Sequence, residues 1–522
     1  MSVDCKMSRA VLNLYRSKLE KALGVTADRP FAVMIWATKT LQSEGPGPAS
    51  PFLKYPPEAI TTDVASKYFA HPWKMETLFN ELLSTKKILL KKGKKGRTLD
   101  CKNFNTVANL SNILGQIENA EDGITLERID VMQEVHRLGQ RQFEWQRGFM
   151  NLPLFYRSHF IYGGKLTSEF FQREYGIPIV NFTLFCFALR AMFTERPGVL
   201  KSTSFSDISI SSEQRDACLR LISLDIAQAR ALASSIRSGP GHISYKRSIL
   251  RTHPCIEFPE GGGALVAPLP DLVMLRATSG LFYDVIRGGE NVRNEIAFRF
   301  EEYSRELLSA LMPSFGVEGS YKYKYKKNLV DTPDLFIREN GTTRIILECK
   351  ATRMSYEARF SEHPLANARR GYDEIAKGIF QIWRFVSHCR RGIVQSEKLS
   401  ENTVGIVLTL DTWLTMANVM QKDVIDAAKQ MCLERDTDII ASDQVPVIFC
   451  PIDELEHTLS TATERGFITA VDAATQEKFE GWMLGSVHQK VCPDEKTQRI
   501  YPFADRVEQS IPWWGKFGHA SS

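Results

Sequence analysis

The residues with the clearest capacity for chemistry are Asp334, Glu348 and Lys350, which lie in one stretch of the chain, Leu329 to Thr352. Asp334 opens a short apolar run, and a second apolar run ends in Glu348-Cys349-Lys350. Charged groups at the edge of a buried core are energetically costly unless they pair with one another or hold a metal ion. The pattern therefore indicates either a functional site or a structural ion pair.

A β-hairpin is expected to position these residues. Asn340-Gly341 separates the two apolar runs, and this dipeptide between apolar runs is a strong hairpin signal. Because successive side chains of a strand point to opposite faces, Glu348 and Lys350 share one face while the Cys349 side chain points to the other, toward the core. An aspartate, a glutamate and a lysine would then converge at the open end of the hairpin.

A helix and a further strand are expected before the hairpin. The helix has an apolar stripe formed by Ile296, Phe300, Tyr303, Leu307 and Leu311. The strand, Tyr321 to Lys327, alternates aromatic and basic residues. Its aromatic face is expected to pack, while the face with Lys322, Lys324 and Lys326 is expected to contact water or phosphate.

A long helix, residues 366–392, is expected after the hairpin. Its apolar stripe is Ile375, Ile379, Ile382 and Val386. Its opposite, polar side carries Lys377, Gln381, Arg384 and His388, and we expect a solvated histidine there. Two more apolar runs, 404–410 and 445–450, each lead from a strand into a helix. The resulting order of elements predicts a mixed sheet flanked by helices.

Composition places few limits on function. The chain has 522 residues, of which 43% are hydrophobic and 24% charged, and a net charge of +5 that permits a polyanionic partner. Ten cysteines without CxxC pairs indicate neither a zinc site nor a disulfide framework, so we expect reduced thiols and a cytoplasmic protein. The most apolar run, Phe182 to Phe193, is too short to span a bilayer and contains Arg190. A buried core helix and no membrane partner are expected.

Residues 1–285 are predicted to be mostly helical and carry no motif that names a function. A capping box at Ser211 and Gln214 opens a predicted helix that extends to Ser238. The basic run at 84–97 is either a phosphate-contacting loop or a solvated one. The lysines of this run that we take as candidate nucleic-acid contacts are Lys91, Lys92, Lys94 and Lys95.

The arrangement Pro333-Asp334 … Glu348-Cys349-Lys350, with 13 residues (335 through 347) between the two acids, resembles the PD-(D/E)xK motif of the restriction-endonuclease-like nuclease superfamily. The order of elements over about 288–455 is also similar to that family's αβββαβ core. The resemblance covers roughly a third of the chain, and together with the helical pattern of residues 1–285 it leads us to expect an α+β or α/β multidomain protein. Its parts would be a mostly helical region (1–285, one or two subdomains), a nuclease-like domain with a mixed central sheet (286–460) and a C-terminal extension packing on that domain (461–522).

The resemblance also implies roles for the hairpin residues in phosphodiester hydrolysis. Asp334, Glu348 and the backbone carbonyl of Cys349 would bind Mg²⁺, for which Mn²⁺ can substitute. Lys350 would orient or deprotonate the attacking water, or stabilise the charge that develops on phosphorus. Burial and a metal would both lower the pKa of this lysine, whereas the carboxylates would oppose that shift.

Two flanking helices would complete the site by the same resemblance. The helix before the hairpin would lend a glutamate, and we choose Glu301 over Glu295 because Glu301 borders the apolar stripe. The helix after it would lend Gln381, with Lys377 as the second choice. The alternatives are that Glu301 is an ordinary surface glutamate and that Gln381 lies on a solvent-exposed helix face.

The expected function is therefore that of a metal-dependent endonuclease. DNA is the first expectation for its substrate, with 5′-phosphate products, and RNA is the alternative. Restriction or anti-phage defence would suit a large accessory region, which could bind a protein partner or a second copy. The competing hypothesis is a catalytically silent, nuclease-like module that binds nucleic acid or a partner, against which the intact Asp-Glu-Lys set argues.

Overall fold

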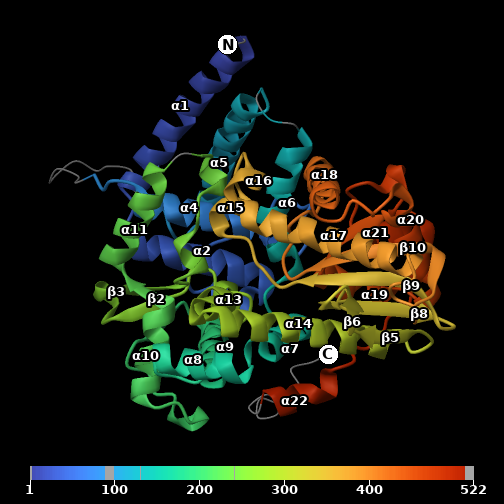
Figure 1. The fold of residues 1–522 in the computed structure, drawn as a ribbon. Coiled ribbons are helices and arrows are strands. Elements are labelled where there is room, and N and C mark those ends of the chain that lie inside the picture. Colours follow the sequence, from blue (N-terminus) through green and yellow to red (C-terminus); the bar gives the residue numbers. More distant parts are fainter. Residues whose placement is uncertain (1–2, 89–98, 128, 130, 240, 512–522) are drawn as a thin grey trace, which may run out of the picture. The chain divides into compact units, whose positions relative to one another are not determined.

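The computed structural model describes residues 3–88, 99–127, 129, 131–239 and 241–511, which form two compact units (Figure 1). The first unit comprises Met1–Asp130, Arg141–Met150 and Ser168–Asp284, and the second comprises Val131–Gln140, Asn151–Thr167 and Val285–Ser522. Two segments from early in the sequence thus belong to the second unit. The candidate contacts Lys91, Lys92, Lys94 and Lys95 lie outside the described residues.

The first unit is mostly helical, as its sequence predicts, and also contains a small four-stranded sheet. Its helices are α1 (Val3–Gly24), α2 (Asp28–Ser43), α3 (Pro46–Ala49), α4 (Pro72–Ser84), α5 (Phe104–Thr125), α9 (Ile179–Glu195), α10 (Ser212–Ile222), α11 (Ile226–Ser238) and α12 (Asp271–Ala277). The sheet has the order β1-β4-β3-β2, formed by Gly198–Leu200, Ala264–Val266, Cys255–Phe258 and Ser223–Asp225. Helices α6 (Val131–Arg147), α8 (Lys165–Tyr175) and α13 (Leu281–Val285) contain residues of both units.

Two predictions for this unit have different outcomes. The apolar run at 182–193 lies in α9 and is largely buried, as predicted. The prediction of a single helix from Ser211 to Ser238 is wrong, although the predicted capping box at Ser211 is present. The chain leaves the helix for the short strand β2, which pairs with β3, and a second capping box at Asp225 begins α11.

No single described helix is long and apolar enough to cross a membrane. The pair α8 and α9 meets the criteria of length and composition only when taken together, and the two helices are bent by 68° relative to each other.

The second unit contains the elements that carry the hairpin. Its helices are α7 (Leu152–Tyr162), α14 (Glu290–Leu311), α15 (Tyr356–Arg359), α16 (Pro364–Asn367), α17 (Arg369–Arg390), α18 (Asn418–Arg435), α19 (Ile452–Thr461), α20 (Glu464–Ala474), α21 (Leu484–Val491) and α22 (Val507–Ser510). Its strands are β5 (Gly316–Gly319), β6 (Lys322–Tyr325), β7 (Asn328–Asp331), β8 (Leu335–Glu339), β9 (Thr342–Lys350), β10 (Leu399–Thr409) and β11 (Val447–Pro451).

A five-stranded mixed sheet forms the centre of the second unit, in the order β11-β10-β9-β8-β5. Strands β5, β8 and β9 are antiparallel neighbours, whereas β9, β10 and β11 run parallel. Helix α17 connects β9 to β10 and lies along one face of the sheet, and α14 lies along the other face (Figure 1). The predicted mixed α/β arrangement is therefore present.

The β8–β9 hairpin and its two helices follow the sequence pattern closely. Asn340 and Gly341 both adopt positive φ angles, 51° and 77°, which is the backbone of a two-residue hairpin turn. The predicted apolar stripes of both helices are buried. On the α17 face, Phe336 of β8 and Ile346 of β9 join a core that includes Ile375, Ile379 and Ile382.

The strand predicted at Tyr321 to Lys327 does not belong to this sheet. Residues 322–325 instead form β6, whose one partner strand among the described residues is β7, in a separate two-stranded hairpin, and β5 takes the expected place beside β8. The predicted faces of the strand are correct. Tyr323 is buried against α17, and its ring lies 6.3 Å from that of Phe385, while Lys322 and Lys324 are exposed.

Candidate active site

The end of the β8–β9 ladder brings Asp334 to Glu348 and Cys349. The ladder closes at the pair Leu335–Leu347, and Pro333, two residues before Leu335, has no N–H with which to continue it. The N–H of Cys349 instead donates to Asp334 Oδ2 at 2.7 Å. Because the N–H and C=O of a strand residue point to the same side, the Cys349 carbonyl is directed toward Asp334 as well.

Glu348 and Lys350 share the face of β9 that is covered by α17. Lys350 Nζ donates to Glu348 Oε1 at 2.8 Å. Glu348 is only 2% exposed, and its second oxygen, Oε2, is buried without a hydrogen-bond partner among the described residues. A buried carboxylate oxygen in this state is unfavourable unless a cation or donor approaches it. The ion pair that the sequence allowed as the alternative to a functional site is present, but it satisfies only one of the two carboxylate oxygens.

Helix α17 reaches the pair at a glycine. A Cβ atom placed on Gly378 would lie 3.0 Å from both Glu348 Cγ and Lys350 Cε, which is closer than an ordinary Cβ contact, so the close approach of the helix favours glycine here. Gln381 lies one turn further along α17 and is partly buried, and its Oε1 also has no hydrogen-bond partner among the described residues. Lys377 is exposed and pairs with Glu374 at 3.7 Å. Of the two α17 candidates, Gln381 is thus the less solvated.

On the nuclease hypothesis drawn from the sequence, Gly378→Ala is expected to lower the rate of phosphodiester cleavage about tenfold and to leave the protein folded. The added methyl group displaces Glu348 and Lys350 by a few tenths of an ångström, and small displacements at a reacting centre are costly. Alanine also favours a helix over glycine by about 1 kcal/mol. The measurements are turnover and thermal unfolding. Gly115→Ala in α5 is the matched control, because its Cβ would meet only Lys74 Nζ at 3.6 Å. Equal turnover in both variants would contradict the expectation.

Glu301 from α14 belongs to the same electrostatic group. Burial and the charge of Glu348 raise the pKa of Glu301 to about 7, with Asp331 adding to the shift and Lys350 opposing it. Glu295, the alternative, accepts hydrogen bonds from the backbone N–H groups of residues 166 and 167. The structure therefore brings Glu301, and not Glu295, near the hairpin carboxylates.

The carboxylates also shift the pKa values of Asp334 and Lys350. Burial raises the pKa of Asp334 well above its usual range, and the charges of Glu348 and Glu301 add to this effect. Burial alone would lower the pKa of Lys350, but the charge and hydrogen bond of Glu348 outweigh burial and raise it. Without a metal, Lys350 is therefore an ammonium group, which favours electrostatic stabilisation over proton abstraction.

The donor set fits a hard divalent cation. Two carboxylates and a main-chain carbonyl are oxygen ligands of the kind that Mg²⁺ prefers, and the unpartnered Oε2 of Glu348 offers a buried electron pair. The buried thiol of Cys349, whose pKa is raised well above its usual range by burial, remains protonated and offers only its carbonyl.

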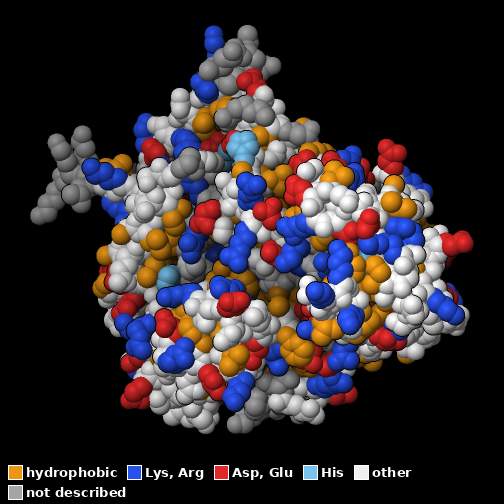
Figure 2. Space-filling view, viewed as in Figure 1, with side chains coloured by type: hydrophobic (Ala, Val, Ile, Leu, Met, Phe, Trp, Pro, Cys, Tyr) orange, Lys and Arg blue, Asp and Glu red, His pale blue; other side chains and the backbone are white. Residues whose placement is uncertain are grey.

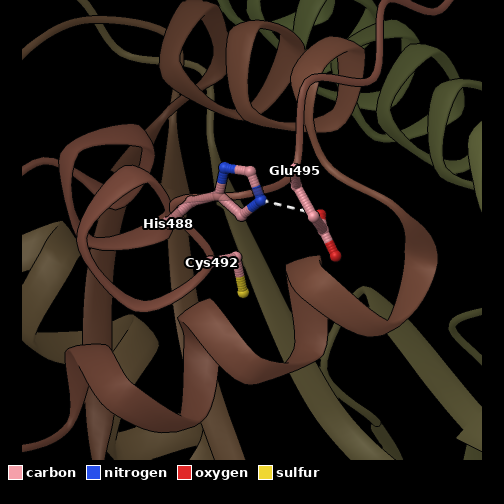
Figure 3. Close-up of side chains that lie close together, drawn as sticks. All are labelled: His488, Cys492 and Glu495. Atoms are coloured by element: carbon pink, nitrogen blue, oxygen red, sulfur yellow. Dashed lines mark hydrogen bonds and ion pairs between the residues drawn. The ribbon is translucent and has the colours of Figure 1, made fainter.

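A different group of potential ligands lies near the C-terminal end of α21 (Figure 3). In the part of the chain that the structure describes, His488, Cys492 and Glu495 are the one trio of His, Cys, Asp or Glu ligand atoms within 4.8 Å of one another. Glu495 accepts from His488 Nε2 at 3.0 Å and from the backbone N–H of Thr463 at 2.9 Å. These bonds join the segment after α21 to the start of α20. This structural role is sufficient to explain why the residues lie together. Sequence spacing did not indicate this trio.

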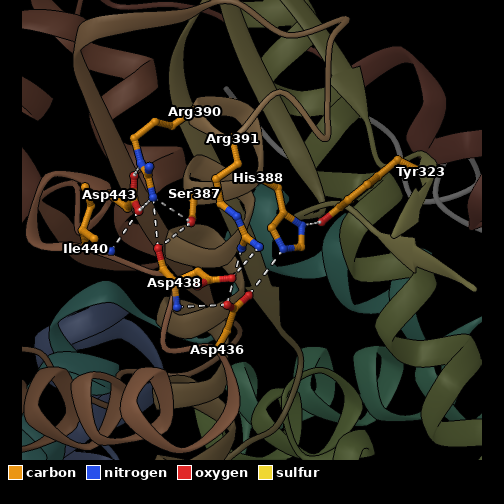
Figure 4. Close-up of polar contacts among 9 residues, drawn as sticks. All are labelled: Tyr323, Ser387, His388, Arg390, Arg391, Asp436, Asp438, Ile440 and Asp443. Atoms are coloured by element: carbon orange, nitrogen blue, oxygen red, sulfur yellow. Dashed lines mark hydrogen bonds and ion pairs between the residues drawn. The ribbon is translucent and has the colours of Figure 1, made fainter. Parts of the chain in front are cut away.

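The β6–β7 hairpin packs against α17, and Tyr323 of β6 points toward His388 near the C-terminal end of that helix (Figure 4). His388, predicted to be solvated, is fully buried, and that prediction is wrong. The Tyr323 hydroxyl is 2.7 Å from His388 Nδ1, and Asp436 Oδ2 is 3.4 Å from Nε2. Burial lowers the pKa of His388, so its ring is neutral at pH 7. This network anchors a hairpin whose other face carries the exposed lysines.

Basic side chains gather over α15 to α17 on the face shown in Figure 2. Arg369, Arg370 and Lys377 are exposed on the first half of α17, before the turn that covers Glu348. Exposed Lys324 and Lys326 lie on the β6–β7 hairpin, and Lys322 there pairs with Asp331 at 3.5 Å. Polyanions are attracted to such groups through their phosphates.

The sequence did not indicate two residues that act on the site. Asp331 lies three positions before Asp334, and its charge contributes to the raised pKa of Glu301. Gly378 was visible only as a glycine inside a helical pattern, a signal that often marks a close packing contact.

The chain matches no protein-family model, and we found no match among curated proteins or solved structures.

Proposed function

We propose that the second unit is a metal-dependent nuclease domain that hydrolyses phosphodiester bonds, with DNA as the preferred substrate. The observation that carries the proposal is the buried, half-satisfied carboxylate of Glu348, placed beside Asp334, Glu301 and Lys350. Soluble cores rarely retain such a concentration of charge unless it binds a ligand. The elements α14, β5, β8, β9, α17 and β10 follow one another in the αβββαβ order of restriction-endonuclease-like nucleases, and this order supports the proposal.

The residues of the chain have separable roles in this proposal. Asp334, Glu348 and the Cys349 carbonyl would hold Mg²⁺ or Mn²⁺, which supplies charge stabilisation and a water of lowered pKa when bound. Lys350, held as an ammonium by Glu348, neutralises negative charge on the phosphoryl oxygens. Glu301, with a pKa of about 7, is able to accept or release a proton near neutral pH. Gln381 orients water or phosphate through its free amide oxygen or its NH₂ group.

The basic hairpin supplies the substrate-binding part of the proposal. Lys322→Ala, Lys324→Ala and Lys326→Ala combined are expected to weaken binding to duplex DNA and to reduce the slope of log K against log salt by about 0.9 for each phosphate that is no longer neutralised. A salt titration of fluorescence anisotropy measures both quantities. Lys429→Ala with Lys490→Ala, on α18 and at α21, is the control. An unchanged salt slope in the hairpin variant would remove the hairpin from the proposed interface.

The experiment that tests the proposal compares single-stranded DNA, double-stranded DNA and RNA side by side, with Mg²⁺, Mn²⁺ or EDTA. We expect metal-dependent cleavage, fastest on DNA. Faster cleavage of RNA would assign the same site to a ribonuclease. Binding without cleavage of any of the three, in both metals, would favour a catalytically silent module that binds nucleic acid.

A further inference from the structure

Strand β11 is the outer edge of the central sheet on the side away from β8 and β9. In the described residues it pairs only with β10, in parallel, and no strand lies on its other side. An edge of this kind presents main-chain N–H and C=O groups that remain available for pairing unless another segment covers them.

The register identifies which groups of β11 are free. The N–H of Gly405 donates to the carbonyl of Pro446, and Gly405 is aligned with Val447. In a parallel ladder this means that residues 446, 448 and 450 direct their main-chain groups to β10. Val447 and Phe449 therefore direct their N–H and C=O groups outward.

A groove of about 440 Å³ runs beside this edge, a volume typical of ligand-binding sites. Its floor is Val447, Ile448 and Phe449. One wall is α18, through Gln421, Lys422 and Ile425, and the other wall is the segment from Ala474 to Leu484.

Trp482 on this second wall is 50% exposed, which is unusual for so large an apolar side chain. Lys422 and Glu480 pair at 3.1 Å across the two walls.

We propose that this groove binds a single extended strand of a partner protein, which adds to the sheet beside β11. Only an extended peptide offers donors and acceptors at the alternate spacing of Val447 and Phe449. Its side chains would point in turn to the α18 wall and to the wall of Phe479, Trp482 and Leu484, so apolar residues are expected at every second position. A second copy of this chain fits less well, because its own β11 is recessed between the same walls.

The test uses a fluorescein-labelled nine-residue peptide of alternating threonine and leucine with the full-length protein. We expect saturable binding by anisotropy, weakened about tenfold by Val447→Pro, which removes one outward N–H. Proline is tolerated at such edge positions, where the N–H makes no ladder bond. Trp482→Ala is expected to weaken binding to a similar degree. Two further peptides carry N-methyl groups on the odd-numbered or on the even-numbered amides. The peptide whose methyl groups face away from β11 should bind, and the peptide whose methyl groups face β11 should not. Equal binding of both methylated forms, or no binding of the parent peptide, would overturn the proposal.

Hydrogen exchange provides a test that needs no variant. In the free protein we expect the amides of Val447 and Phe449 to exchange much faster than that of Ile448, and to become protected when the peptide is added. Protection of Val447 and Phe449 in the free protein would show that the edge is already covered, and would overturn the proposal. Sedimentation of the unliganded protein as a dimer that Val447→Pro dissolves would assign the edge to a second copy, and would also overturn it.

Discussion

Glu348→Gln is expected to reduce metal-dependent cleavage by about 1,000-fold or more. The substitution keeps the size of the side chain but removes the negative charge and converts the unpartnered oxygen into a weaker ligand or a donor. It also removes the negative charge that Lys350 pairs with, so that only a neutral amide oxygen is left to accept from Lys350 Nζ. Asp334→Asn and Lys350→Ala are expected to act in the same direction, the first on the metal and the second on the charge of the phosphoryl group.

The matched control for Glu348→Gln is Glu339→Gln, at the turn end of the same hairpin. Glu339 pairs with Arg465, whose side chain is 72% exposed, and it lies opposite Thr342, at the end of the hairpin away from Asp334 and Glu348. Rates of cleavage at saturating Mg²⁺ and unfolding curves should be measured for both variants. A folded Glu348→Gln protein that cleaves as fast as the parent, with the same metal requirement, would contradict the assignment of Glu348.

Glu301→Gln is expected to stabilise the metal-free protein at pH 8 by about 1–2 kcal/mol of unfolding free energy, after allowance for the exposure of this side chain. In the folded protein, burial and the charge of Glu348 raise the pKa of Glu301 from 4.5 to about 7. The folded state therefore binds more protons than the unfolded state between these values. Its stability falls as the pH rises from 4.5 to 7 and levels off above 7, when the carboxylate is charged in both states.

Urea unfolding in EDTA at several pH values measures this effect. The parent should lose stability between pH 5 and pH 8 relative to Glu301→Gln, and the difference should vanish below about pH 4.5. Mg²⁺ at 100 times its dissociation constant should then stabilise the parent by about 2.7 kcal/mol at pH 8. Parallel pH profiles of the two proteins would contradict the electrostatic description of the site.

Local patterns in the sequence were sufficient for the hairpin and its two helices. Asn340-Gly341 determines a turn through its own backbone preference, and the stripe on α17 depends only on the 3.6-residue period. The pairing of β6 could not be predicted in this way. Alternation showed that residues 321–327 form a strand with one buried face, but the choice between β7 and β8 as partner depends on the turn at Lys326, whose φ is 55°.

Such local patterns could not predict contacts between residues that are distant in sequence. The burial of His388 required the β6–β7 hairpin to fold over α17. The first half of α6 supports the loops that follow β9 and β10. His136 Nδ1 is 2.7 Å from the carbonyl of Thr415, and Arg137 Nε donates to the carbonyl of Phe360. Helical periodicity in this segment gives no sign of these partners, which lie more than 200 residues away.

The most direct test of the proposed metal centre is the binding of Mn²⁺ to the metal-free protein, followed by electron paramagnetic resonance at pH 8. The proposal predicts saturable binding at the Asp334–Glu348 pair, competed by Mg²⁺ and weakened at least about tenfold by Glu348→Gln but not by Glu339→Gln. Equal Mn²⁺ binding by the parent and Glu348→Gln proteins would contradict it.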